Sequence, residues 1–121
     1  MLKELSTPVI KTLISSLRDK STDALRFRHV VKEITKLLLY ESLRRSALVS
    51  KEVQTWNELE SHEVLDESSF VVVTVLRAGM PMLESVMETL PKVTGGFLAM
   101  KRDENSYQSR LYYDRLPDCR D

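Results

Sequence analysis

One apolar run in the middle of the chain limits the possible folds more than any other feature. Residues 70–76 read Phe-Val-Val-Val-Thr-Val-Leu, without polar residues at alternate positions. Uninterrupted β-branched runs of this kind are typical of a strand that is buried on both faces of a parallel sheet. The run is also far shorter than the roughly 20 apolar residues that a membrane-spanning helix needs. The sequence therefore predicts an α/β protein with this strand in its interior and no membrane span.

The residues after this run complete the pattern of a β-α-β unit. The strand ends at Arg77, and Pro81 suits the first turn of a helix because its missing N–H is not needed there. Apolar residues then recur with helical spacing as far as Leu90. After Gly95-Gly96, a second short strand is predicted over residues 97–100. A unit of about 30 residues in this order places two parallel strands beside each other with a crossover helix.

Two amphipathic helices are predicted upstream of this unit. Apolar residues at spacings of three and four indicate one helix that begins after Thr7-Pro8, and a second one over residues 27–38. The polar segment 19–23 is then the loop between them. Residues 49–56 are compatible with a strand, although their alternation is imperfect.

Composition and charge exclude several classes of protein. The 121 residues carry 18 Lys and Arg against 18 Asp and Glu, so the basic footprint of a nucleic-acid-binding protein is missing. Glu4 and the lack of an apolar segment after it argue against a secretory signal, and the single Cys119 cannot form an intramolecular disulfide. His29 and His62 have no second ligand at metal spacing, so no metal site is expected. We expect a cytoplasmic protein that binds neither nucleic acid nor membranes.

The number of buried strands indicates that the domain is incomplete. Only two strands of the sequence read as parallel and buried, whereas sheets of this kind commonly have about five or six. The predicted interior strand needs cover on both faces and neighbours along its edges. We therefore expect residues 1–121 to be the N-terminal portion of a single domain whose C-terminal part is absent.

Both predicted strands are followed by an arginine, and the edge where they end is the candidate binding site. In open α/β sheets, ligands bind outside the carboxyl ends of the strands. Arg77 opens the turn Ala78-Gly79, where the missing Cβ of the glycine would let a ligand approach backbone N–H groups, and Arg102 follows the next strand. Two guanidiniums beside a helix N-terminus favour a phosphate or diphosphate ligand. The alternative is that each arginine pairs with a surface carboxylate such as Asp103.

Several segments together make a family recognisable, although none of them would do so alone. They are Thr22-Asp23-Ala24-Leu25-Arg26-Phe27-Arg28, Leu38-Leu39-Tyr40-Glu41, Val75-Leu76-Arg77-Ala78-Gly79-Met80-Pro81-Met82, Met100-Lys101-Arg102-Asp103-Glu104 and Tyr112-Tyr113-Asp114-Arg115-Leu116-Pro117. With these segments in this order and spacing, the chain resembles the uracil phosphoribosyltransferases over essentially its whole length.

The resemblance implies a type I phosphoribosyltransferase fold, a parallel sheet with flanking helices, here incomplete. It also implies a pyrimidine-salvage enzyme that joins uracil to phosphoribosyl pyrophosphate, with Mg²⁺, to give UMP and pyrophosphate. In that family two arginines contact phosphoribosyl pyrophosphate, and these match Arg77 and Arg102; Ala78 and Gly79 lie in the same binding segment. The residues after Arg102 resemble the family's mobile arm. No catalytic residue is assigned, and a homodimer or higher oligomer is expected.

The chain departs from the family's pattern at both ends. Thr7-Pro8-Val9 stands where the family usually has His-Pro-Leu. The family's phosphoribosyl-binding loop and uracil-binding segment lie beyond the position of Leu116-Pro117, and this sequence ends at Asp121. We therefore expect the pyrophosphate side of the site alone, and no turnover by these residues in isolation. The alternative is a non-catalytic, phosphoribosyltransferase-like module that serves in assembly or regulation.

Overall fold

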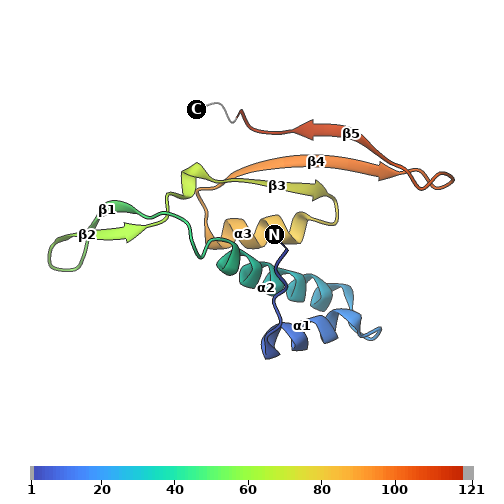
Figure 1. The fold of residues 1–121 in the computed structure, drawn as a ribbon, viewed down its shortest axis with the longest axis horizontal. Coiled ribbons are helices and arrows are strands. Elements are labelled where there is room, and N and C mark those ends of the chain that lie inside the picture. Colours follow the sequence, from blue (N-terminus) through green and yellow to red (C-terminus); the bar gives the residue numbers. More distant parts are fainter. Residues whose placement is uncertain (1, 119–121) are drawn as a thin grey trace.

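The computed structural model describes residues 2–118, so Cys119 lies outside the described part. Figure 1 shows helices on one side of a sheet and a separate hairpin beside them. No helix in residues 2–118 is long and apolar enough to cross a membrane. The elements are α1 (Pro8–Arg18), α2 (Ala24–Ser42), β1 (Val49–Gln54), β2 (Leu59–Val64), a 3-10 turn (Glu67–Ser69), β3 (Val71–Leu76), α3 (Met80–Thr89), β4 (Thr94–Arg102) and β5 (Ser109–Arg115).

Capping side chains fix the starts of α1 and α2, and α2 begins at Ala24, three residues before the predicted range 27–38. The Thr7 side chain accepts a hydrogen bond from the Ile10 N–H at 3.4 Å, and Pro8 opens α1. The Asp23 carboxylate accepts from the Arg26 N–H at 2.7 Å at the start of α2. Helix α3 has its proline in the first turn, as predicted.

The predicted β-α-β unit is confirmed, and the sheet contains one strand that the sequence did not reveal. Strands β3 and β4 are parallel, with Val71 opposite Thr94. Strand β4 is longer than the predicted 97–100, because Gly95 and Gly96 belong to it. The missed strand, β5, pairs antiparallel with β4, which gives the order β3-β4-β5.

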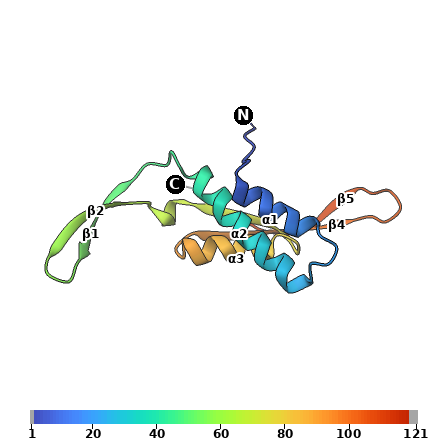
Figure 2. The same ribbon diagram turned by 90° about the horizontal axis from the view of Figure 1, so that it is seen from below.

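A second, two-stranded sheet lies apart from the first. Strand β1 confirms the strand that residues 49–56 allow, but its antiparallel partner β2 was missed. In Figures 1 and 2 this hairpin extends away from the helices. Most of its side chains are exposed, so it adds little to the core.

The core lies between the β3-β4-β5 sheet and the helix pair α2 and α3, with α1 packed against α2 (Figure 2). Val30 on α2 and Ser85 on α3 are completely buried. The Ser85 hydroxyl donates to the backbone carbonyl of Lys32 at 2.7 Å. The Lys32 ammonium binds Glu88 and lies 3.9 Å from Glu84. The hydrogen bond to Glu88 raises the pKa of Lys32. A buried hydrogen bond and charged contacts therefore join the two helices.

The central strand is covered on one face only, which corrects the prediction that it is buried on both. Thr74 faces the helices and is 6% exposed, whereas Val73 and Val75 on the other face are each 46% exposed. All the helices in residues 2–118 lie on a single side of the sheet (Figure 1). The apolar run is therefore a strand of the sheet, but residues 2–118 cover only one of its two faces.

The one-sided core predicts a clear difference between two valine substitutions. Val30→Ala removes methyl groups from a completely buried position on α2 and should lower the free energy of unfolding by about 2 kcal/mol. Val75→Ala on the open face should cost about 0.5 kcal/mol or less. Urea unfolding followed by circular dichroism measures both. Equal losses at the two positions would mean that the open face is covered in solution.

Candidate functional site

The candidate site is the turn between β3 and α3, at the carboxyl end of the strand. The Gly79 N–H donates to the Val75 carbonyl at 2.9 Å, and the Met80 N–H donates to the Arg77 carbonyl at 3.1 Å. The peptide bond between Leu76 and Arg77 is cis. The N–H groups of Arg77 and Ala78 donate to no acceptor within residues 2–118. Unsatisfied N–H groups at the start of a helix are suited to an anion.

Packing within the turn itself explains why position 79 is a glycine, a reason that the sequence alone does not show. A Cβ at this position would overlap the Thr74 hydroxyl and lie 2.8 Å from the Val75 carbonyl oxygen. Its φ is −77°, a value open to any residue. The glycine is therefore required because the turn folds back tightly against its own strand, whatever a ligand does on the outer side.

Two hollows adjoin this turn, and Arg77 and Ala78 line both. One, of about 500 Å³, follows β3 and is floored by the α3 side chains Met82, Leu83 and Val86. The other, of about 640 Å³, lies between the turn and the start of α2. Arg77, Ala78 and Gly79 thus come together as predicted, beside space for a ligand.

Arg102 lies apart from the other predicted residues. Leu76, the last residue of β3, is level with Ala99 on β4, so Arg102 is three positions farther along. At about 3.3 Å per residue, this is roughly 10 Å beyond the end of β3. Arg102 pairs with Ser109 on the arm formed by β4 and β5, which projects past β3 in Figure 1. It lines neither of the two hollows.

Neither predicted arginine is neutralised within the described residues. No carboxylate of residues 2–118 forms an ion pair with Arg77 or Arg102. The alternative that they pair with carboxylates such as Asp103 is therefore not realised in this part of the chain. Both guanidiniums remain available to an anion.

The Asp103 carboxylate has a structural partner of its own at the tip of the arm. It accepts hydrogen bonds from the N–H groups of Asn105 at 3.0 Å and Ser106 at 2.7 Å, and from the Ser106 hydroxyl at 3.1 Å. These bonds lower the pKa of Asp103. The Tyr107 N–H donates to the Asp103 carbonyl at 2.9 Å, and Tyr107 itself has a φ of 56°. Asp103 therefore organises the turn that connects β4 to β5.

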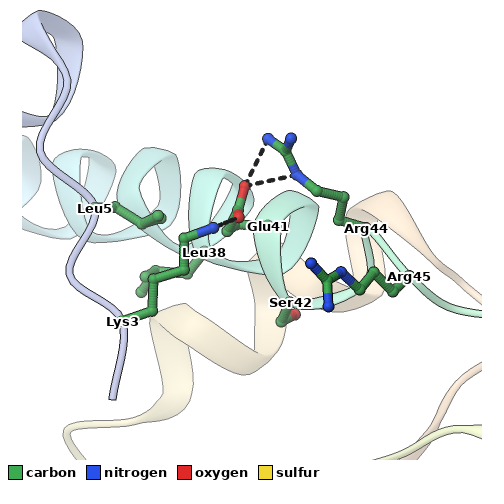
Figure 3. Close-up of a pocket in the computed structure, with 7 residues that line it drawn as sticks. All are labelled: Lys3, Leu5, Leu38, Glu41, Ser42, Arg44 and Arg45. Carbon is green, nitrogen blue, oxygen red and sulfur yellow. Dashed lines mark hydrogen bonds and ion pairs between the residues drawn. The ribbon is translucent and has the colours of Figure 1, made fainter. Parts of the chain in front are cut away.

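A cluster of charged residues at the C-terminal end of α2 gives the segment 38–41 a structural role (Figure 3). Glu41 binds the Lys3 ammonium and lies 2.8 Å from the Arg44 guanidinium. The hydrogen bond from Lys3, supported by that of Arg44, lowers the pKa of Glu41. The cluster borders a hollow of about 500 Å³ and ties the N-terminal segment to α2.

Metal ligands do not gather at any of these places. Within the part of the chain that the structure describes, no group of three or more His, Cys, Asp or Glu side chains could hold an ion. The turn itself offers the Arg77 guanidinium and backbone N–H dipoles. Together with the fold, it defines an α/β protein with a candidate anion-binding edge at the end of its parallel strands.

Comparison with known proteins identifies the family. The family model described as uracil phosphoribosyltransferase matches residues 4–121, and the chain belongs to this family. The fold class expected from the resemblance, a type I phosphoribosyltransferase-like sheet with flanking helices, is confirmed in its partial form.

Similar proteins cover the chain almost completely. It is 38% identical over 120 residues to a uracil phosphoribosyltransferase from Aquifex aeolicus, across 99% of this chain and 58% of the relative. A uracil phosphoribosyltransferase from Campylobacter fetus is 36% identical over 116 residues, across 96% of this chain and 55% of the relative. A solved structure of an Aquifex aeolicus protein superposes with a TM-score of 0.89 at 39% identity, across 98% of this chain and 57% of that one. The chain thus spans somewhat more than half the length of these relatives.

The close approach at Gly79 predicts a large effect of adding one methyl group. Gly79→Ala should lower the free energy of unfolding by about 1–3 kcal/mol, because the new Cβ collides with the backbone of β3. Gly95→Ala is the matched control, since a Cβ there meets no atom within 4 Å. Thermal unfolding of the two variants measures the difference. Two variants of equal stability would contradict this account of the turn.

The lowered pKa of Asp103 predicts that the tip of the arm depends on pH. The hydrogen bonds favour the ionised carboxylate in the folded state, so their stabilisation is present above the ordinary pKa of about 3.9 and is lost as the pH falls through the lower, folded value. The amide NMR signals of Asn105 and Ser106 should therefore shift below about pH 4. In Asp103→Asn, which keeps an acceptor but cannot titrate, this shift should vanish. An unchanged pH response in that variant would assign it to another group.

Proposed function

We propose that this chain provides the pyrophosphate-binding side of a uracil phosphoribosyltransferase, which converts uracil and phosphoribosyl pyrophosphate to UMP and pyrophosphate in pyrimidine salvage. The observation that carries the proposal is the turn at the carboxyl end of β3, where Arg77 has no ion pair and two N–H groups have no acceptor within residues 2–118. Membership of the family supplies the reaction. We further propose that the protein acts in the cytoplasm.

The chemistry of this reaction fits such a turn. Negative charge develops on the pyrophosphate as its bond to the ribosyl carbon breaks, and fixed cations and N–H dipoles stabilise charge where it develops. Arg77 and Ala78 line the hollow beside the turn and Gly79 follows them, which supports this role for the three residues. Arg102 is proposed as a further contact, which approaches from the arm.

Mg²⁺ is proposed to accompany the substrate's diphosphate. This ion is commonly held by substrate phosphates with one or two carboxylates, rather than by a cage of protein ligands. The described residues offer no cage of their own, so no step of the proposal depends on protein ligands to the ion.

A second candidate function, a non-catalytic module for assembly or regulation, is favoured by a separate observation. The open face of the sheet exposes Val71, Val73 and Val75 by 41–46% each, and exposed apolar patches of this kind mark interaction surfaces. The same surface gives a motive for the dimer or higher oligomer that we propose. The two functions differ in whether phosphoribosyl pyrophosphate is bound.

Binding of phosphoribosyl pyrophosphate tests the proposed function. Isothermal titration in the presence of Mg²⁺ should show binding by the 121-residue chain, and Arg77→Ala should weaken it by about tenfold or more, because a charge-assisted hydrogen bond is lost. Arg45→Ala, an exposed arginine at the other end of α2, is the control and should leave binding unchanged. UMP formation is assayed in the same samples. Absence of binding would contradict the proposed site and favour the module, whereas binding without UMP is the result expected of the pyrophosphate-binding side alone.

A further inference from the structure

The hollow between the turn and the start of α2 contains a second arginine that sequence reasoning did not assign. Arg28 lines this hollow of about 640 Å³ together with Arg77, Ala78 and Pro81. It belongs to the segment 22–28 that helps to carry the family resemblance, but its place on α2 reads as an ordinary solvated helix face. The structure instead places it across the hollow from the turn that bears Arg77.

The charges around this hollow leave both arginines free. Two carboxylates also line it, but each is already engaged. Asp23 accepts the Arg26 N–H at 2.7 Å as the cap of α2, and Glu84 lies 3.9 Å from the Lys32 ammonium. No carboxylate within residues 2–118 forms an ion pair with Arg28 or Arg77.

The packing of α2 and α3 adds positive electrostatic potential at this hollow. Contacts between α2 and α3 advance along both helices in the same direction, from the Arg28 side of the hollow, through Lys32 and Ser85, to Leu39 and Leu90 at the other end. The two helices are therefore parallel, and both N-termini border the hollow. The positive ends of their dipoles thus lie beside the two guanidiniums.

We propose that Arg28 is a second binding residue for the diphosphate group of the substrate, facing Arg77 across the hollow. Each guanidinium can donate two parallel hydrogen bonds to phosphate oxygens. A diphosphate has two phosphoryl groups, which two separated guanidiniums can hold at once. The inference rests on the proposed function and names a residue of that same site. Arg28 would give the turn a second cation from helix α2, whereas Arg102 lies on the arm formed by β4 and β5.

Inorganic pyrophosphate is the probe that tests this inference. Titration of the 121-residue chain should show binding, and Arg28→Gln should weaken it by about ten- to a hundredfold. Arg26→Gln is the matched control, because it lies on the same exposed helix end but does not line the hollow. It should change the affinity by less than about twofold. Arg28→Lys, which keeps the charge but cannot donate in the same bidentate way, should fall between the wild type and Arg28→Gln.

The outcomes separate this inference from the proposed function. If Arg77→Gln abolishes pyrophosphate binding while Arg28→Gln behaves like Arg26→Gln, the assignment of Arg28 is overturned and the proposed function stands. If the wild-type chain binds no pyrophosphate, both are overturned. Circular dichroism of Arg28→Gln should match the wild type because Arg28 is exposed, and binding lost together with the fold would also count against the assignment.

Discussion

The parallel packing of α2 on α3 is the constraint on which the arrangement of this protein depends. Ser85 is completely buried and donates its hydroxyl to the Lys32 carbonyl, so the two helices approach closely at that point. Helix α3 must begin where β3 ends, because it is the crossover between parallel strands. Helix α2 runs alongside it in the same direction, and its N-terminus is therefore brought to the carboxyl end of β3 as well. One local contact thus determines which residues surround the candidate site.

Local chemistry made much of the fold predictable. Thr7, Asp23 and Pro81 set helix starts through bonds or ring geometry that depend on neighbouring residues alone. Strand β5 was missed because all its side chains are exposed, so no alternation of polarity records its pairing with β4. The one-sided cover of β3 was missed for another reason: the sequence shows that a strand is apolar, but not where its covering helices come from.

The residues of the candidate site also differ in how far the sequence predicts their positions. Arg77, Ala78 and Gly79 are consecutive, so the sequence could place them together. The collision partner of Gly79 is Thr74 on the preceding strand, and only the folded turn reveals it. The neighbourhood of Arg28 depends on helix packing between distant segments, and the displacement of Arg102 depends on how far β4 continues past its partner. The presence of the segment 22–28 among the family's motifs was the one sequence signal that pointed to Arg28.

Strand β5 occupies the outer edge of β4, and within the described residues β3 has no strand on its other side. Within the described residues, a further strand could therefore pair with the far edge of β5 or with the open edge of β3. The carboxyl end of β3 is also where Arg77 stands, and the hollow of about 500 Å³ runs along the same strand. A strand that pairs with β3 in parallel would bring its own carboxyl end beside Arg77. At that edge, adding a strand to the sheet and adding residues to the candidate binding site would be one event.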